Sequence, residues 1–148
     1  MGSSRLPGKT LLPLGSRTIL TYLGERLKRS RTLDDVVVAT TLLSRDDVIV
    51  AECEQHGIAW FRGSEEDVLG RYLGAAIAMD AEIVLRITAD NPFTDPESID
   101  RVVEHIRRSG ARYVIEDRLP VGTTGEALTL GMLAFIDKVA TEPALREQ

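Results

Sequence analysis

Hydrophobic and polar positions follow two different spacings along the chain. Residues 18–30 and 95–109 place apolar side chains every three or four positions, the spacing of an amphipathic helix. Residues 35–41 and 82–88 carry short β-branched runs, which predict buried strands. The same patterns predict, in chain order, a helix over 44–57, a strand over 58–62, a helix from residue 64, strands over 112–115 and 126–130, and a helix over 132–140.

The alternation of predicted strands and helices indicates an α/β fold. Parallel strands need crossover connections, and crossover helices cover the sheet, so we expect a mostly parallel sheet with helices on both faces. Gly57 and Gly110 stand where two helices are expected to end. Asp95 with Pro96 marks the start of the helix that ends before Gly110. Ligands of such folds bind at the carboxyl ends of strands, on loops that lead into helices.

The chain opens on a glycine-rich loop with no predicted strand before it. Gly2, Ser3 and Ser4 allow the backbone to approach an anion closely, and Arg5 and Lys9 supply phosphate-binding charge. The spacing differs from that of a Walker A loop. The loop therefore fits a polyphosphate, although an N-terminus without a binding role, or a remnant of an expression tag, explains the same residues.

A second candidate site follows the strand predicted over 82–88. Asp90 lies on the loop after this strand, where a carboxylate can hold Mg²⁺ together with substrate phosphates. Asp95 is expected to cap the next helix. A third stretch, residues 61–72, also has the order strand, turn and helix start, and helix capping and the helix dipole are the favoured explanation of its Ser64, Glu66 and Asp67.

Composition narrows the class of protein. The chain has 148 residues, of which 43% are hydrophobic and 28% charged, values typical of one globular domain. Its apolar runs are too short for a membrane-spanning helix, and the N-terminus lacks the apolar core of a secretory signal, so we expect a soluble, cytoplasmic protein that binds no membrane. Cys53 is the single cysteine, which excludes an internal disulfide, and His56 and His105 lack metal-ligand spacing.

Charge is distributed unevenly along the sequence. The net charge is -5, which argues against nucleic-acid binding. Residues 1–33 nevertheless carry seven bases and one acid, a net charge of +6, whereas the remainder carries 11 bases and 22 acids. A basic entrance on an acidic body favours a small anionic ligand, although the bases at 28–31 also suit the end of a helix.

The N-terminal loop, residues 61–72 and the segment around Asp90, in this order, resemble the cytidylyltransferase family that includes the acylneuraminate and ketodeoxyoctonate enzymes. The resemblance is greatest to the spore-coat polysaccharide branch of this family. Residues 2–9 match the end of the family's opening Gln-Ala-Arg-x-Gly-Ser-x-Arg-Leu-Pro-Gly-Lys. Residues 61–69 match Phe-Arg-Gly-Ser-Glu-Glu-Asp-Val-Leu, and residues 86–92 match Arg-Ile-Thr-Gly-Asp-x-Pro with Ala89 in place of glycine. Residues 120–126 are similar to a later loop on the acceptor side.

The resemblance implies a three-layer, nucleotide-diphospho-sugar-transferase-like (Rossmann-like) fold and a reaction. CMP would move from CTP to an acidic sugar or a similar acid, with release of pyrophosphate, in a magnesium-dependent step of polysaccharide biosynthesis. Arg5 and Lys9 would act as catalytic residues on the triphosphate, and Asp90 would hold Mg²⁺. The remaining implied residues are Arg62, Ser64 and Arg71 near the base and ribose, and Gly122, Thr123 and Glu126 on the acceptor side.

The chain also departs from the family pattern. The opening strand and its Gln-Ala-Arg are absent, and Gly70 stands where the family often has aspartate. Relatives continue past a segment that residues 145–148 begin to match, and that part usually adds a second metal-binding aspartate and a dimerisation arm. We therefore expect residues 1–148 to form a single, incomplete nucleotidyltransferase domain of a homodimer.

Two alternatives to this function stay open at the level of sequence. A non-catalytic nucleotide-binding or assembly module would keep the fold and lack part of the active site. A transferase for another nucleotide is the second alternative, because guanylyl- and uridylyltransferases share a similar loop. The acceptor itself is not identified by the residues.

Overall fold

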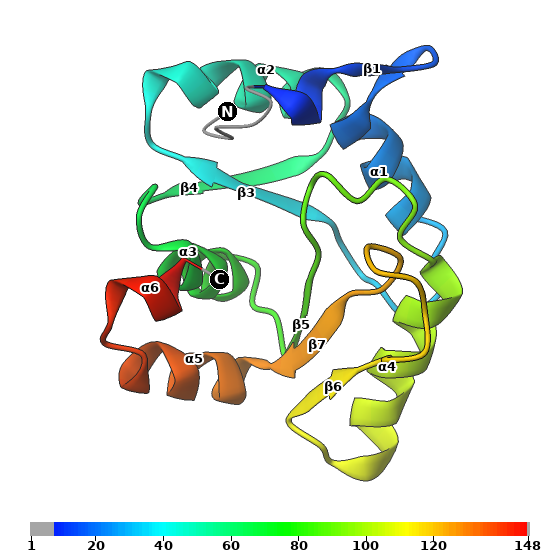
Figure 1. Ribbon diagram of the computed structural model, residues 1–148, viewed down its shortest axis with the longest axis vertical. Helices are drawn as coiled ribbons and strands as arrows, with labels where there is room; N and C mark the ends of the chain where they lie inside the picture. The colour runs from blue at the N-terminus through cyan, green and yellow to red at the C-terminus, as the bar shows by residue number, and fades with distance from the viewer. Residues whose placement is uncertain (1–7, 148) are drawn as a thin grey trace.

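A computed structural model describes residues 8–147 of the chain (Figure 1). Helices alternate with short strands along most of this length. The helical elements are η1 (Lys9–Leu11), α1 (Ile19–Leu27), η2 (Ser44–Asp46), α2 (Asp47–Gln55), α3 (Val68–Ala78), α4 (Pro96–Ser109), α5 (Leu130–Val139) and α6 (Pro143–Arg146). The strands are β1 (Pro13–Leu14), β2 (Arg17–Thr18), β3 (Val37–Thr41), β4 (Ala59–Gly63), β5 (Ile83–Arg86), β6 (Tyr113–Ile115) and β7 (Glu126–Thr129).

The strands form a parallel pair, a three-stranded antiparallel sheet and a hairpin. β3 and β4 pair in parallel, joined by the crossover helix α2, with Val38 opposite Trp60. In the second sheet, of order β5-β7-β6, β7 runs antiparallel to both neighbours. Since β6 and β7 are connected without a helix, the chain reverses direction between them. The β1–β2 hairpin around Gly15 was not predicted, because two-residue strands carry no periodic signal.

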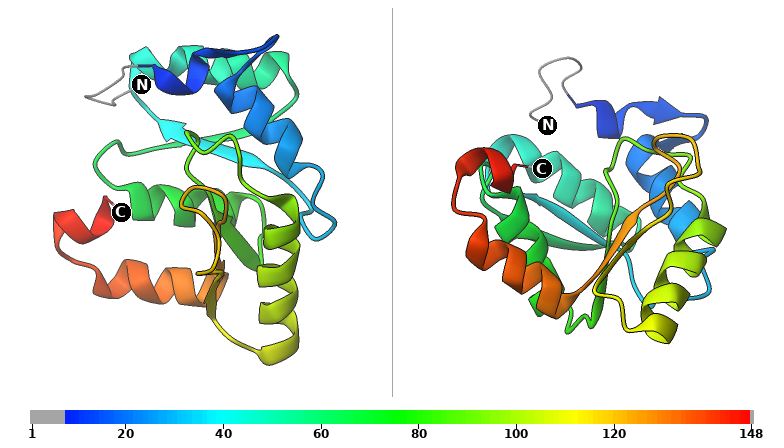
Figure 2. Two further views of the ribbon diagram at one scale, coloured as in Figure 1. Left: turned by 45° about the vertical axis from the view of Figure 1, so that its right-hand side comes forward. Right: turned by 60° about the horizontal axis from the view of Figure 1, so that its bottom comes forward.

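Helices cover both faces of the strands, as predicted (Figure 2). Ile83 and Leu85 of β5 pack against α1 and α4, whereas Val84 between them packs against α3 and α5. Successive residues of a strand point to opposite faces, so the alternation at β5 places one helix pair on each side. The predicted α/β fold with helices on both faces is therefore confirmed.

Helix α4 is the best-defined element that the sequence predicts. Its buried stripe is the predicted one, and Ile99 in that stripe has no exposed surface. Asp95 caps the first turn, since its carboxylate accepts hydrogen bonds from the N–H groups of Glu97 and Ser98. Gly110 ends the helix with a φ of 70°, in the left-handed region that favours glycine.

Two predicted helix starts were wrong by a few residues. The helix predicted from Ser64 begins at Val68, because the carboxylate of Asp67 caps it by accepting a hydrogen bond from Gly70 N at 2.8 Å. The helix predicted from Ser44 begins at Asp47, after a 3₁₀ turn. The carboxylate of Asp46 does not cap α2 and instead accepts hydrogen bonds from two threonine hydroxyls at the end of β3.

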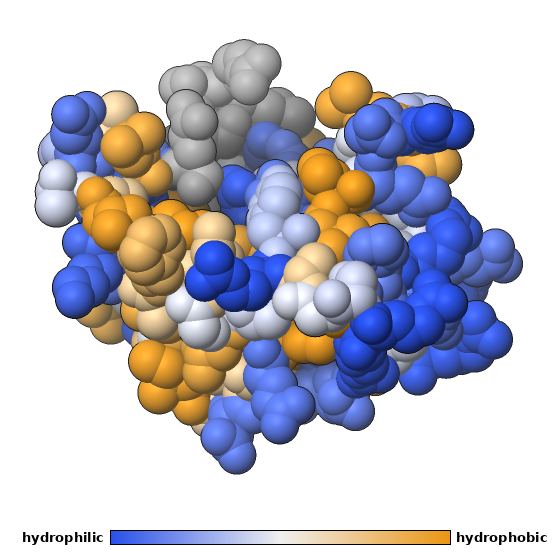
Figure 3. Space-filling model, turned by 90° about the horizontal axis from the view of Figure 1, so that it is seen from below, coloured by the Kyte–Doolittle hydropathy of each residue, from blue (hydrophilic) through white to orange (hydrophobic). Residues whose placement is uncertain are grey.

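Apolar side chains remain exposed on α5. Phe135 and Val139 are each 55% exposed, and apolar atoms gather on one side of the face seen from below (Figure 3). An exposed apolar face is typical of an interface, and the predicted homodimer stays a prediction. Within residues 8–147, every helix is too short or too polar to cross a membrane.

Asp100 on α4 fixes the chain that follows α1. Its carboxylate is buried and accepts hydrogen bonds from Ser30 Oγ at 2.6 Å, Arg31 N at 2.9 Å and Thr32 N at 3.1 Å. Burial by itself raises the pKa of Asp100, but these hydrogen bonds outweigh it and lower the pKa from 3.8 to about 2. The loop after α1 is thereby attached to the inner side of α4.

Removing the Asp100 carboxylate charge is expected to destabilise the fold. We predict that Asp100→Asn lowers the free energy of unfolding by about 2 kcal/mol at pH 7, because buried donors lose their ionised acceptor. Since folding depresses the pKa of Asp100, its stabilisation is present above about pH 4 and is lost as the pH falls toward 2. Urea unfolding at pH 7 and pH 3 measures both effects, with the exposed Asp117→Asn as control. An equal effect of the two variants at pH 7 would contradict the assignment.

Candidate functional site

An ion pair joins the N-terminal segment to the loop after β5. Lys9 Nζ contacts Asp90 Oδ2 across 81 positions of sequence. The cause lies in the neighbouring residues, since Leu11 and Ala89 pack against the same apolar cluster. The two predicted site residues are therefore brought together by burial of apolar side chains beside them.

Hydrogen bonds to the Asp90 carboxylate favour its ionised form. The hydrogen bond from Lys9 lowers the pKa of Asp90, burial opposes this, and a hydrogen bond from Thr88 lowers the pKa further. The side chains of Lys9 and Asp90 are 33% and 37% exposed, so both are accessible to a ligand. The site thus offers one cation and one anion to a phosphate-bearing molecule.

A single carboxylate fits one mode of magnesium binding. Mg²⁺ is commonly held by one or two carboxylates together with substrate phosphates. Within residues 8–147, no group of three or more His, Cys, Asp or Glu side chains is placed to hold a metal ion. Asp90 therefore fits a magnesium ion that a triphosphate also binds, and does not fit a metal held by protein groups alone.

The loop after β5 is held by its own hydrogen bonds. Asn91 Nδ2 donates to Thr88 Oγ1 at 2.7 Å, and Thr94 Oγ1 donates to the carbonyl of Asn91 at 2.9 Å. Arg26 of α1 donates from Nε to the carbonyl of Thr94 at 2.7 Å. These contacts fix the backbone on both sides of Asp90.

The predicted acceptor-side loop lies against this loop. Asp95 N donates to the carbonyl of Thr123 at 2.7 Å. A Cβ atom built on Gly122 would lie 3.0 Å from Asn91 Oδ1. The φ of Gly122, 86°, also favours glycine at this position. Gly122 and Thr123 are therefore brought next to the Asp90 loop, and Glu126 follows them as the first residue of β7.

The third predicted stretch makes contacts of a structural kind. Arg62 donates from Nε to the carbonyl of Thr41 at 2.7 Å and from Nη2 to that of Leu43 at 2.8 Å. Arg71 donates from Nη1 to the carbonyl of Ser64 at 2.6 Å, and burial lowers the pKa of Arg71. Among the residues that the structure describes, no polar contact joins this stretch to Lys9 or Asp90. A role for Arg62, Ser64 and Arg71 in nucleotide binding stays a prediction.

Residues 2–5 of the predicted phosphate loop lie outside the described part of the chain. The roles of Gly2, Ser3, Ser4 and Arg5 therefore stay predictions as well. At the end of this loop, Gly8 has a φ of 69° and precedes the 3₁₀ turn that carries Lys9.

Arg146 ties the end of the chain to the start of α3. Its Nε and Nη2 donate to the two carboxylate oxygens of Asp67 at 3.0 and 2.9 Å. Its Nη1 donates to the carbonyls of Asp137 and Ala140, each at 2.9 Å. The paired hydrogen bonds from Arg146 lower the pKa of Asp67. This arginine was not singled out from the sequence, since its partners are distant along the chain.

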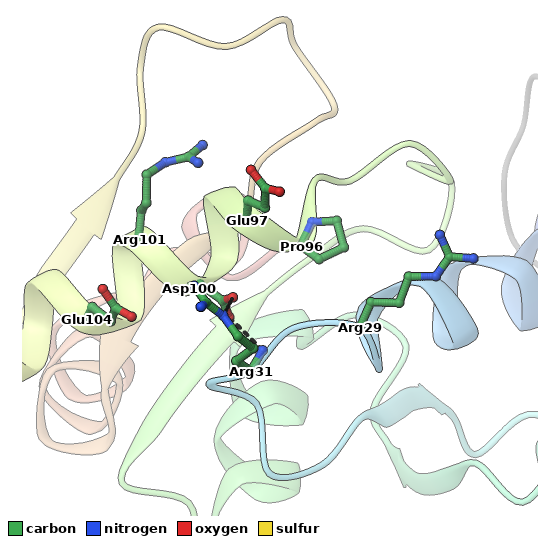
Figure 4. A pocket seen from close by; sticks show the side chains of 7 residues that line it. All are labelled: Arg29, Arg31, Pro96, Glu97, Asp100, Arg101 and Glu104. Carbon is green, nitrogen blue, oxygen red and sulfur yellow. Dashed lines mark hydrogen bonds and ion pairs between the residues drawn. The ribbon is translucent and has the colours of Figure 1, made fainter.

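One hollow in the described structure lies away from the candidate site. It has a volume of about 560 Å³ and is lined by residues of α4 and of the segment after α1 (Figure 4). Its lining includes both arginines and acidic residues, and the carboxylate of Asp100 already accepts hydrogen bonds from the loop after α1. This hollow therefore has no charge preference for an anionic nucleotide.

Arg86 is a site residue to which the sequence assigned no role. It is the last residue of β5 and lies opposite Glu126 of β7. Its guanidinium lies over the ring of Tyr72, with Cζ 5.7 Å from the ring centroid. Its Nε is buried without a hydrogen-bond partner among the described residues, a cost of about 1–3 kcal/mol. An arginine at the end of a buried strand was the available signal.

Comparison with known structures defines the class of protein. The chain is similar to a cytidylyltransferase from Leptospira borgpetersenii, with a TM-score of 0.92 and 37% identity over 100% of this chain and 64% of that one. It also shares the fold of a CMP:2-keto-3-deoxy-manno-octonic acid synthetase complexed with CTP, with a TM-score of 0.76 at 17% identity, over 99% of this chain and 78% of that one. The architecture is thus the α/β fold of nucleotide-sugar transferases.

Sequence comparison narrows this class to a family. Residues 1–146 match the family described as cytidylyltransferase. An uncharacterized protein of Methanocaldococcus jannaschii is 43% identical over 146 residues, which are 99% of this chain and 60% of that protein. The spore coat polysaccharide biosynthesis protein SpsF of Bacillus subtilis is 38% identical over 143 residues, 94% of this chain and 60% of that protein. The chain belongs to the cytidylyltransferase family and spans about 60% of the length of these two relatives.

The Arg146 contacts are expected to contribute to stability. We predict that Arg146→Ala lowers the free energy of unfolding, because the part-buried carboxylates of Asp67 and Asp137 lose their partner. Arg108→Ala, on the exposed side of α4, is the matched control and should cost less than about 1 kcal/mol. Chemical unfolding of both variants measures the difference, and equal midpoints would contradict the prediction.

Proposed function

We propose that the chain carries the nucleotide site of a cytidylyltransferase that moves CMP from CTP to an acidic acceptor and releases pyrophosphate. The observation that carries the proposal is the contact of Lys9 with Asp90 beside the loop of Gly122 and Thr123, in a chain of this family. This contact joins the predicted triphosphate loop to the predicted metal carboxylate on the loop after β5, and the predicted acceptor loop contacts that same loop through Thr123.

Lys9 acts on the phosphates in this proposal. An acceptor oxygen attacks the α-phosphorus, and the bond from this phosphorus to the pyrophosphate oxygen breaks. Negative charge then grows on the leaving pyrophosphate, and a fixed ammonium close to it lowers the barrier. Lys9 is free for this role once CTP competes with Asp90 for it, and Arg5 of the same loop adds a second cation.

Asp90 would hold magnesium together with the triphosphate. A divalent ion there supplies positive charge that polarises the phosphoryl oxygens. Because its pKa is lowered, the Asp90 carboxylate is ionised at neutral pH whether or not a metal is bound. Lys9 compensates that charge before CTP binds.

The acceptor side of the proposal concerns an acid. Relatives named as 3-deoxy-manno-octulosonate cytidylyltransferases are 33–35% identical over 104 residues. The contact of Thr123 with Asp95 on the segment after Asp90 supports an acceptor side formed by Gly122, Thr123 and Glu126. We propose that the acceptor of this chain is also an acid, and that the chain acts in polysaccharide biosynthesis in the cytoplasm.

A non-catalytic nucleotide-binding module is the second candidate. One observation favours it, namely that Asp90 is not part of a larger group of metal ligands within residues 8–147. Such a module would bind CTP without releasing pyrophosphate, so a pyrophosphate assay beside a binding assay separates the two candidates.

The phosphate role of the basic loop is tested by CTP binding. We expect Lys9→Ala and Arg5→Ala each to weaken CTP binding by about 10- to 150-fold, because a charge-assisted hydrogen bond contributes about 1.5–3 kcal/mol. Calorimetric titration with CTP and Mg²⁺ measures this, with GTP and UTP for selectivity and the exposed Lys28→Ala as control. A folded parent chain that binds no CTP, or variants that bind like the parent, would contradict the assignment.

The metal role of Asp90 is tested by the same titration with and without magnesium. We expect Mg²⁺ to strengthen CTP binding to the parent and to have little effect on Asp90→Asn, which lacks the ionised ligand. Without Mg²⁺, Asp90→Asn is expected to bind CTP at least as well as the parent, because Lys9 is released from its ion pair. A magnesium effect of the same size in both proteins would assign the metal elsewhere.

A further inference from the structure

The guanidinium of Arg86, at the end of the strand that leads to Asp90, is only partly satisfied by hydrogen bonds. Its Nη1 lies 3.5 and 3.4 Å from the two carboxylate oxygens of Glu126, which is long for a charge-assisted hydrogen bond. Its Nε has no partner among the described residues. In the same structure, Arg146 reaches carboxylates at 2.6–3.0 Å through Nε and Nη2. Arg86 therefore has N–H groups without short hydrogen bonds, whereas those of Arg146 are paired.

Three elements hold Arg86 in place without satisfying it. Cross-strand register sets it directly opposite Glu126 at the ends of β5 and β7, which lie side by side (Figure 1). Tyr72 of α3 supplies a ring face beneath the planar guanidinium. The side chain of Arg86 is 28% exposed and that of Glu126 is 35% exposed, so a small ligand can reach the pair.

The position of Arg86 places this capacity next to the proposed chemistry. Arg86 precedes Asp90 by four residues at the carboxyl end of β5, and Glu126 directly follows the loop that contacts Asn91 and Asp95. Because Nε is buried, a ligand reaches the guanidinium through its Nη atoms, whose paired N–H groups match the two oxygens of a carboxylate. The loose contact with Glu126 shows that one carboxylate already occupies this side.

We propose that Arg86 binds the carboxylate of the acidic acceptor, with Glu126 as the partner that this carboxylate replaces. The proposal rests on the proposed function and narrows the acceptor to acids whose carboxylate reaches Arg86 while an acceptor oxygen reaches the α-phosphorus. It makes Arg86 a specificity-determining residue, whereas Lys9 and Asp90 serve the nucleotide.

The experiment compares an acid with its ester. The full chain, with CTP present and Mg²⁺ left out so that CMP is not transferred, is titrated with 3-deoxy-manno-octulosonate and with the methyl ester of this acid. We expect the acid to bind the parent more tightly than the ester, and Arg86→Ala to weaken binding of the acid by about 10- to 150-fold. Arg86→Lys should restore only part of this, because lysine keeps the charge and loses the planar pair of donors. Arg101→Ala, which removes an exposed arginine paired with Glu116 on α4, is the matched control.

Glu126→Gln gives a result of opposite sign. Removing the competing carboxylate is expected to tighten binding of the acid, and a loss as large as that of Arg86→Ala would overturn the replacement of Glu126. Equal binding of acid and ester by the parent, absence of binding of both, or an Arg86→Lys variant that binds like the parent would each overturn the proposal. CTP binding that persists in these cases leaves the proposed function standing, whereas loss of CTP binding by the parent contradicts the proposed function itself.

Discussion

The position of the Asp90 loop, which connects β5 to α4, depends on the burial of α4 between α1 and β5. Ile99 and Val103 of α4 pack with Leu23 and Leu27 of α1, and the inward side chains of β5 complete the same cluster. Asp100, next to Ile99, adds hydrogen bonds to the loop after α1. This packing joins the parallel β3–β4 pair and its helices to the antiparallel β5-β7-β6 sheet, since the two sheets share no ladder of hydrogen bonds among the described residues.

The site lies where these two halves meet. Lys9 belongs to the half formed by the first elements of the chain, and Asp90 belongs to the loop that connects β5 to α4. Leu11 and Ala89 bury their side chains in one apolar cluster, so the ion pair lies at the edge of that cluster. Apolar burial thus positions polar groups that contribute little stability at an accessible surface.

Two arginines show how differently the fold uses the same side chain. Arg146 donates to five oxygen atoms of Asp67, Asp137 and Ala140 and holds the chain end on α3 and α5. Arg86 is held by register and by an aromatic ring, yet its Nε stays without a partner among the described residues. Full satisfaction of hydrogen bonds is typical of a structural role, whereas unused donors beside a ligand site favour recognition.

The sequence by itself determined the order of helices and strands, the buried stripe of α4 and the caps at Asp95 and Gly110. These features are local, because they follow from side-chain periodicity and from hydrogen bonds between near neighbours. The exact starts of α2 and α3, the β1–β2 hairpin, the contact of Asn91 with Gly122 and the pairing of Arg86 with Glu126 were decided by tertiary structure. Each of these depends on which distant segments pack together. Because the hydrophobic effect is non-directional, the apolar residues of a single sequence do not show which segments they will pack against.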